Sequence, residues 1–344
     1  MVEALKVRLL GEEKSKVLKR YTENTEAYQL YLQARHQFFK LTPEGIRRSI
    51  ELFEAALEAD PDYAPALAWL GHSYGTLVVF GGMPPETGLP RMAAAIGRAL
   101  KIDEDLDEAQ FAFAMAKMQG ERDWATAERA FSRAIDLNPG HANARAQFGI
   151  LLASLGRDAE AVEQAERALE IDPLGVVTNL DAGMTFWILE DFDRVSEIGD
   201  RVVDLDHNFF GGHMMRSIVD WEKGDLSKAI QNIEKAVPLG LPYGQAFPAC
   251  LYGIAGETEK AKAMLEMMKK PVPGRPVFAA SLAIVHAGLG DLDATFEYLE
   301  AAMENGEAIP FTSLVRQLPG VAEDPRYHEM LERVGLPRRL REEC

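Results

Sequence analysis

The pentapeptide GHSYG at residues 71–75 matches the hydrolase motif G-x-S-x-G. In hydrolases this motif places a serine nucleophile on a strained turn between a strand and a helix. Here Ser73 falls in the middle of an apolar helical pattern, which Gly71 and Tyr74 fit as packing residues. A helix interior does not supply the strained turn. A hydrolase that uses Ser73 is therefore a remote alternative, and we expect no catalytic residue and no enzyme activity.

Two further stretches carry candidate metal ligands. The run DLDHN (204–208) has acidic residues at alternate positions, as a calcium loop does at its start. It lacks the glycine and the final glutamate that complete such a loop. His207 and His213 have no cysteine or carboxylate partner at the spacing of a zinc site. We therefore expect no metal, and without a glycine-rich phosphate loop we expect no cofactor.

Composition and charge restrict the class of protein and its partners. Of the 344 residues, 47% are hydrophobic, and Ala, Leu and Glu outnumber β-branched residues, which favours helix. The net charge of −17 repels phosphate backbones and anionic lipids, so we expect neither a nucleic acid nor a membrane as partner. The two cysteines, Cys250 and Cys344, do not make a disulfide framework, and the N-terminus does not resemble a signal peptide. These features predict a cytoplasmic protein.

A period of 34 residues organises most of the chain. RAIDLNP begins at residue 133 and RALEIDP at residue 167, so that Pro139 and Pro173 end two similar segments. The same slot recurs at His207 and Leu241. Each unit carries two apolar helical patterns, and proline cannot continue the second helix. Periods of this length indicate stacked supersecondary units that bury their apolar faces against each other.

The sequences LAWLGHSY (67–74) and TAERAFSRAIDLNP (126–139) resemble the tetratricopeptide repeat (TPR), a 34-residue helix–turn–helix. The resemblance implies an all-α, superhelical solenoid of about eight helix pairs with a C-terminal cap. We expect an N-terminal cap or linker helix over 1–23, the TPR array over 24–304, and capping helices and a tail over 305–344. The expected pairs span 24–61, 64–104, 107–139, 142–173, 176–207, 210–241, 243–270 and 276–304, and VVFGGMPPETG (78–88) is expected to form a loop inside the second.

The region around GEEKSKVLKRYTENTEAYQLYLQARHQFFKLTPEG and the final DPRYHEMLERVGLP are similar to one particular kind of TPR array. That kind forms the C-terminal part of many bacterial signalling proteins. It follows a nucleotide-cyclase-type domain, a winged-helix DNA-binding domain or a Ser/Thr kinase domain. The resemblance covers about residues 5–337 and implies a sensory or adaptor array. It does not imply that this chain has the upstream activity.

In TPR arrays the first helix of each pair lines a concave groove, and the residues predicted to face it here are mostly apolar. Trp187 and Trp221 are 34 residues apart and occupy equivalent slots. Aromatic and methionine side chains on such a face suit the recognition of an apolar peptide or helix of a partner protein. The expected partner-binding residues are Phe111, Met115, Met118, Ile150, Val177, Leu180, Met184, Trp187, Ile188, Met214, Ile218 and Trp221.

Two alternatives remain at this stage. The apolar residues could instead pack against an inner helix or a neighbouring subunit, and the chain could be the self-association module of a multidomain regulator, forming a homodimer. The groove lacks the asparagine with which some TPR domains hold a C-terminal carboxylate, because the equivalent slot holds His72, Met115, Ile150, Met184 and Ile218. The preferred hypothesis is a non-enzymatic interaction scaffold for an apolar segment.

Overall fold

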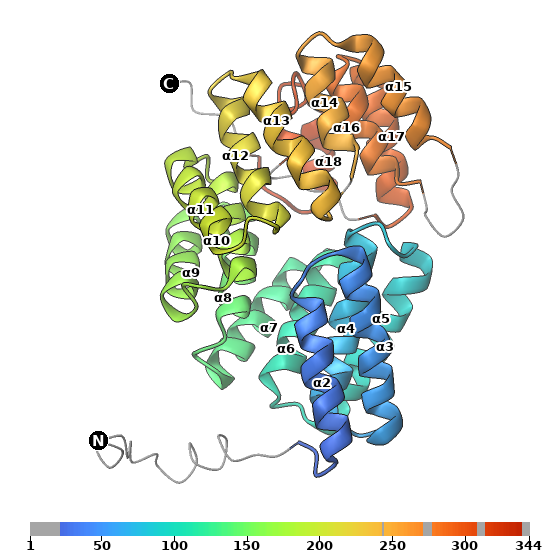
Figure 1. Ribbon diagram of the computed structural model, residues 1–344, viewed down its shortest axis with the longest axis vertical. Helices are drawn as coiled ribbons and strands as arrows, with labels where there is room; N and C mark the ends of the chain where they lie inside the picture. Colours follow the sequence, from blue (N-terminus) through green and yellow to red (C-terminus); the bar gives the residue numbers. More distant parts are fainter. Residues whose placement is uncertain (1–20, 243, 271–276, 308–313, 339–344) are drawn as a thin grey trace.

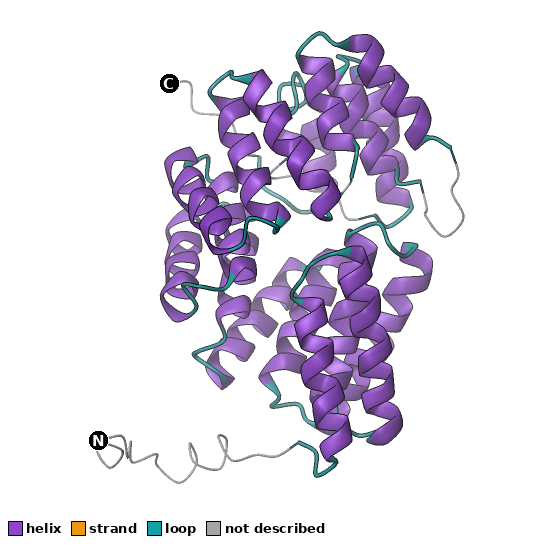
Figure 2. Ribbon diagram, viewed as in Figure 1, coloured by secondary structure: helices purple, strands orange, loops and turns teal. Residues whose placement is uncertain are grey.

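The computed structural model describes residues 21–242, 244–270, 277–307 and 314–338, and within these ranges all regular structure is helical (Figures 1 and 2). The helices are α2 (Thr25–Phe38), α3 (Pro43–Ala59), α4 (Ala64–Val79), α5 (Pro85–Ile102), α6 (Asp107–Ala116), the π-helical turn η2 (Lys117–Glu121), α7 (Trp124–Leu137), α8 (Ala142–Ser154), α9 (Asp158–Ile171), α10 (Val176–Ile188), α11 (Phe192–Leu205), α12 (Phe210–Glu222), α13 (Leu226–Ala236), the 3₁₀ turn η3 (Val237–Leu239), α14 (Ala246–Ile254), α15 (Thr258–Met268), α16 (Ala279–Gly288), α17 (Leu292–Glu304) and α18 (Pro325–Arg333).

Consecutive helices form eight pairs, from α2 with α3 to α16 with α17, and each pair falls inside one of the eight expected ranges. The expectation of about eight helix pairs is confirmed. The expected N-terminal helix lies almost wholly outside the described residues, as do the PVPGRP linker (271–276) and the last residues of the tail.

The turns inside the pairs follow from local sequence. Gly224 and Gly290 end first helices with φ of 76° and 77°, a left-handed conformation that glycine adopts without steric cost. The next residues, Asp225 and Asp291, cap the second helices by accepting hydrogen bonds from the backbone amides three positions later. A short Gly-Asp turn therefore reverses the chain and starts the next helix.

Small residues let the helices of neighbouring elements approach closely. A Cβ added at Gly288 of α16 would lie 2.4 Å from the Cys250 carbonyl oxygen of α14. A Cβ added at Gly253 would lie 2.5 Å from the Gly288 carbonyl oxygen. Real Cβ atoms do not occur at such distances from backbone atoms, so these two glycines set how closely α14 and α16 pack.

The expected loop at 78–88 is shorter than predicted. Helix α4 continues to Val79 and α5 begins at Pro85, so only residues 80–84 connect them. Proline at the first position of a helix is favourable, because its fixed φ suits the helix and its missing N–H needs no partner there. The Gly/Pro content therefore marked a helix start as well as a loop.

The array curls until its first pairs meet its last ones (Figure 1). The Phe80 ring, which follows α4, lies 6.0 Å from the Phe210 ring of α12, measured between centroids. A Cβ added at Gly81 would lie 3.2 Å from the Phe278 ring before α16, and one at Gly240 would lie 3.2 Å from Thr42 Cγ2. These contacts join parts of the chain that are more than 120 residues apart and enclose the inner face of the superhelix.

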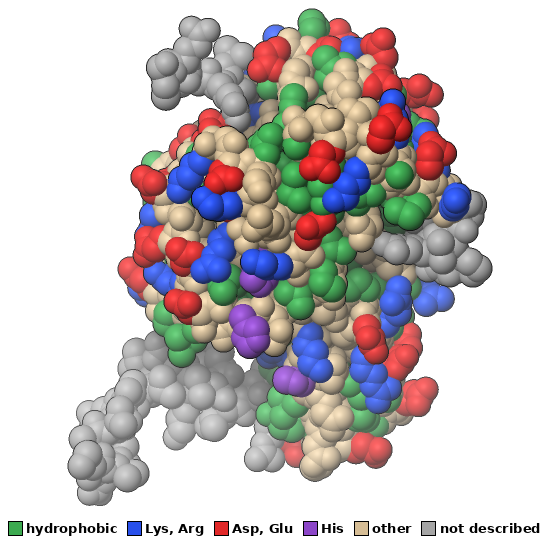
Figure 3. All heavy atoms as spheres, turned by 45° about the horizontal axis from the view of Figure 1, so that its top comes forward, with side chains coloured by type: hydrophobic (Ala, Val, Ile, Leu, Met, Phe, Trp, Pro, Cys, Tyr) green, Lys and Arg blue, Asp and Glu red, His purple; other side chains and the backbone are tan. Residues whose placement is uncertain are grey.

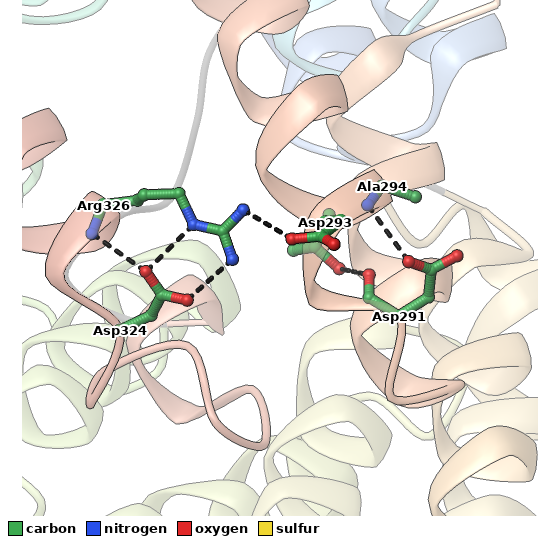
Figure 4. A network of polar contacts seen from close by, with 6 residues as sticks. Asp291, Asp293, Ala294, Asp324 and Arg326 are labelled. Carbon is green, nitrogen blue, oxygen red and sulfur yellow. Dashed lines mark hydrogen bonds and ion pairs between the residues drawn. The ribbon is translucent and has the colours of Figure 1, made fainter.

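The tail ends the array by packing α18 on α17. Arg326 donates from Nε to Asp324 Oδ1 at 3.0 Å and from its terminal nitrogens to Asp324 at 2.8 Å and Asp293 at 2.9 Å (Figure 4). The Arg326 guanidinium also lies 4.3 Å from the centre of the Phe296 ring. Tyr327 and Met330 of α18 are fully buried. The tail thus covers the apolar face that the last pair would otherwise expose.

We predict that Gly288→Ala destabilises the protein, because its methyl group would have to displace the Cys250 backbone. Overpacking of this kind costs about 1–3 kcal/mol. The matched control is Gly97→Ala in α5, where an added Cβ meets nothing within 4 Å. The control should raise the free energy of unfolding by up to about 1 kcal/mol through helix propensity. Urea denaturation followed by circular dichroism measures both, and equal effects would contradict the proposed backbone contact.

Candidate functional site

The curled array forms a partly open cavity of about 380 Å³ on its inner face. The first helices of the pairs, α2, α4, α6, α8, α10, α12 and α14, each contribute side chains to its wall. Arg122, Trp124 and the loop residues Leu241 and Pro242 add to it, and the tail contributes Leu314 and Leu336. A cavity of this volume, with a mostly apolar wall and a few polar groups, is typical of a site that binds part of a ligand.

Ten of the twelve predicted partner-binding residues line this cavity, and Ile218 and Trp221 do not. Ile218 is 1% exposed and belongs to the core of the array. Trp221 is half-buried, and its ring lies 6.1 Å from the Phe247 ring in an edge-on arrangement. The ten lining residues are Phe111, Met115, Met118, Ile150, Val177, Leu180, Met184, Trp187, Ile188 and Met214. That they bind a partner stays a prediction.

The ten residues differ in how much of their surface a ligand could reach. Four keep part of their side chain exposed, namely Met118, Ile150, Met184 and Met214. Phe111, Met115, Trp187 and Ile188 are at most 3% exposed, so they form the rigid back of the cavity wall. The partly exposed group, rich in methionine, is the part that can adapt to a ligand.

Trp187 is held by the tail of the same chain. Its indole Nε1 donates a hydrogen bond to Gln317 Oε1 at 2.6 Å, in a buried contact. Arg316, next to Gln317, donates to the Ile188 carbonyl oxygen at 2.9 Å and pairs with Glu190 at 2.7 Å. The tail therefore crosses the inner face as well as covering the last pair.

The same tail reaches the third pair. Trp124 Nε1 donates to the Val334 carbonyl oxygen at 2.5 Å, and Arg122 donates to the Glu307 carbonyl oxygen at 3.0 Å. The repeat pattern gave no signal for these contacts, because the tail has no period and its partners are more than 120 residues away. The tail residues of the cavity wall were accordingly missed by sequence reasoning.

Aromatic rings form a continuous row along one side of the cavity. The His72 ring lies 5.0 Å from Phe38 and 5.0 Å from Phe111, measured between centroids, and 5.7 Å from Trp69. Burial, together with a smaller electrostatic contribution from His141, lowers the pKa of His72 to about 3. His72 is therefore neutral at physiological pH and acts as a packing ring.

Glu108 ties the first three pairs together beside this row. Its Oε1 accepts a hydrogen bond from the Tyr31 hydroxyl at 2.8 Å and one from Trp69 Nε1 at 3.0 Å. Arg35 lies 3.6 Å away as an ion-pair partner. Burial raises the pKa of Glu108, and the nearby Arg35 opposes that shift. Nothing in the repeat pattern predicted these partners.

Asp181 is the only acidic side chain among the described residues that line the cavity. It is also the only charged residue of α10, a helix that is otherwise apolar or neutral. It is 9% exposed, and its carboxylate is hydrogen-bonded to Gln147 of α8. Burial raises the pKa of Asp181 to about 7. A lone acid in an apolar helix is visible in the sequence, but Asp181 is not among the predicted groove residues.

The candidate chemistry of Ser73 finds no support in its surroundings. Ser73 is fully buried inside α4. Its Oγ donates a hydrogen bond to the carbonyl oxygen of Trp69, one turn earlier in the same helix, at 2.8 Å. Within the described ranges, no group of three His, Cys, Asp or Glu side chains could hold a metal ion. The helices described there are all too short or too polar to cross a membrane.

Comparisons with known proteins identify the repeat. The tetratricopeptide repeat family matches residues 118–176, from η2 to the start of α10. The crystal structure of the APC/C hetero-tetramer Cut9-Hcn1 superposes with a TM-score of 0.57 at 14% identity, over 94% of this chain. The described residues form helices and turns and contain no β-strand. The protein is an all-α TPR solenoid.

Other neighbours of this TPR solenoid have the same fold. The human IFIT1 dimer with PPP-AAAA gives a TM-score of 0.52 at 17% identity, covering 76% of this chain and 69% of that one. The solenoid spans only 59% of the matched chain of Cut9-Hcn1. No curated protein sequence matches significantly. At these identities the likeness concerns the fold, and TPR arrays in general are non-enzymatic scaffolds that bind other proteins.

We predict that Asp181→Asn stabilises the TPR solenoid above neutral pH. The folded-state pKa of about 7 exceeds the ordinary value of 3.8, so the folded state binds a proton that the unfolded chain has released between these values. Stability therefore falls as the pH rises from about 4 to about 7. At pH 8 the variant should exceed the wild type by on the order of 2–4 kcal/mol, and the gap should shrink toward pH 5.

Thermal unfolding at pH 5 and pH 8 measures this gap. Asp204→Asn is the matched control, because Asp204 is exposed on α11 and the same substitution there removes the same charge. The control should leave the melting temperature nearly unchanged at both pH values. A stabilisation by Asp181→Asn that did not depend on pH would show that the carboxylate is not the cause.

Proposed function

We propose that this TPR solenoid is a non-enzymatic interaction scaffold that binds an apolar segment of a partner protein in its inner cavity. The observation that carries the proposal is the cavity itself. Its wall is built by the first helices of seven successive pairs, and partly exposed methionine and isoleucine side chains line it. Met184 and Ile150 occupy equivalent slots in neighbouring units, so the wall presents a repeated apolar surface. Such surfaces suit the recognition of apolar side chains.

The volume of the cavity limits what can enter it. About 380 Å³ is near the lower end for sites that enclose a small ligand. A few apolar side chains of a segment fit that space, whereas a whole helix does not. The occupant we propose is therefore a short apolar stretch or the end of a segment, with Leu314 and Leu336 of the tail beside it.

We infer a regulatory context for this scaffold from the resemblance of its sequence to the TPR arrays of bacterial signalling proteins. In that context the array would act as a sensory or adaptor arm in the cytoplasm, and the bound segment would belong to a signalling partner. The proposal concerns the array alone and assigns it no cyclase, kinase or DNA-binding activity.

A displayed library of random octapeptides, selected on the full chain, tests the proposal. We expect binders rich in apolar residues. Met184→Ala should weaken the best binder at least about fivefold, since truncating a side chain at the centre of an interface costs more than about 1 kcal/mol. The matched control is Trp221→Ala, because Trp221 lies outside the cavity. Isothermal titration calorimetry measures both affinities, and an equal loss in both variants would move the binding site away from the cavity.

Self-association is a second candidate function, and one observation favours it. Tyr28 and Leu32 lie four residues apart on α2, where they share a face, and they are 50% and 46% exposed. A dimer through this face should dissociate in Leu32→Glu. Sedimentation velocity of the wild type at tens of micromolar tests it, and a wild-type monomer at that concentration would exclude this dimer.

A further inference from the structure

We propose that Asp181 makes the cavity selective for an apolar segment that carries one cationic side chain, a lysine or an arginine, whose charge pairs with the Asp181 carboxylate. This inference rests on the proposed function and names the chemistry of the segment. Four observations support it: the placement of Asp181, the absence of a competing cation, the aromatic wall and the net charge of the chain.

Asp181 lies inside the proposed contact surface. It belongs to the cavity wall together with Leu180 and Met184 of the same helix. Gln147 occupies the equivalent slot 34 residues earlier, and the two side chains are hydrogen-bonded across α8 and α10. The 34-residue period thus sets an acid and an amide side by side in an otherwise apolar wall. A segment in the cavity would meet this pair directly.

Among the described residues, none supplies a cation that pairs with Asp181. In the described part of the protein, no Lys, Arg or His nitrogen forms an ion pair with it; burial raises its pKa, and the Gln147 hydrogen bond opposes that rise. The helices packed against α10 are α8, α9, α11 and α12, and apart from Gln147 none presents a group that acts on the carboxylate. The other titratable groups of the wall are His72, which is neutral, and Arg122, which donates to the Glu307 carbonyl oxygen.

A buried carboxylate without a cation is unfavourable for folding, which makes it a candidate for a functional group. A ligand cation removes this disadvantage, because the pair forms where water is largely excluded and Coulomb attraction is strong. The rings of Phe111 and Trp187 also line the cavity, and aromatic faces attract cations. An anionic ligand would meet the negatively charged Asp181 carboxylate in place of a hydrogen-bond donor, and the two would repel each other.

Long-range electrostatics act in the same direction. The net charge of −17 attracts cationic segments and raises their local concentration. On the face drawn in Figure 3, acidic and basic side chains are intermingled, so the attraction there comes from the total charge and not from a single acidic patch. The specific element is therefore the acid inside the cavity.

The pH dependence follows from the state of Asp181. Below its pKa of about 7 the carboxyl group holds a proton, which a cationic ligand must displace. The affinity for a cationic segment should rise as the pH increases from about 5.5 to about 7 and level off above that. The affinity for a neutral apolar segment should not follow this profile.

The experiment is the octapeptide selection carried out in parallel on the wild type, on Asp181→Asn and on the exposed-acid control Asp204→Asn. We expect Lys or Arg at one position among the apolar binders of the wild type and of the control, and no such enrichment with Asp181→Asn. The best wild-type binder should lose at least about tenfold in affinity when its cation is replaced by norleucine. The same replacement should change its affinity for Asp181→Asn less than about twofold.

The outcomes separate this inference from the proposed function. Apolar binders without an enriched cation, equally tight on Asp181→Asn, would overturn the role of Asp181 and leave the proposed function standing. A selection that yields no apolar binder would overturn both. A melting temperature of Asp181→Asn at or above that of the wild type shows that a lost preference does not come from misfolding. The affinities of the wild type for the best binder and for its norleucine-substituted version, measured between pH 5.5 and 8, give an independent readout that needs no protein variant.

Discussion

The close approach of helix backbones is the constraint on which the rest of this array depends. A Cβ at Gly149 would lie 3.2 Å from the Ala161 carbonyl oxygen, and one at Gly212 would lie 2.9 Å from the Val203 amide nitrogen. Helices that meet so closely leave no room for larger residues at these points, so the large apolar side chains must lie between successive pairs and on the inner face. Repetition of this arrangement produces both the core and the curvature.

The curvature in turn creates the cavity. Eight pairs are enough for Phe80 to meet Phe210 and for the loop at Gly81 to meet Phe278, so the inner face becomes a partly enclosed space. The tail completes the enclosure, because Gln317 and Arg316 bind the end of α10. A wall that faces a confined space can place one acid in apolar surroundings. On the outer surface, water would cancel most of the effect of that acid.

The two tryptophans show how far a repeat pattern reaches. Trp187 and Trp221 occupy the same slot of neighbouring units, and the pattern gives both the same expected role. In the fold, Trp187 is buried and bonded to Gln317 of the tail, whereas Trp221 lies outside the cavity against Phe247. A repeat fixes how a residue sits within its own helix pair. What a residue meets across the superhelix depends on where its unit lies along the array.

The sequence by itself determined the helices, their pairing and which helix of each pair faces inward, because these follow from a 34-residue period, from small residues at fixed slots and from Gly-Asp turns. Ten of twelve residues expected on the inner face do line the cavity for the same reason. Only the tertiary structure decided that the array closes on itself, that the tail crosses the inner face, and that no cation of the described residues pairs with Asp181. The first two features depend on contacts between residues more than 100 positions apart, and the third depends on the absence of an ion-pair contact to Asp181. A local pattern contains no information about such contacts.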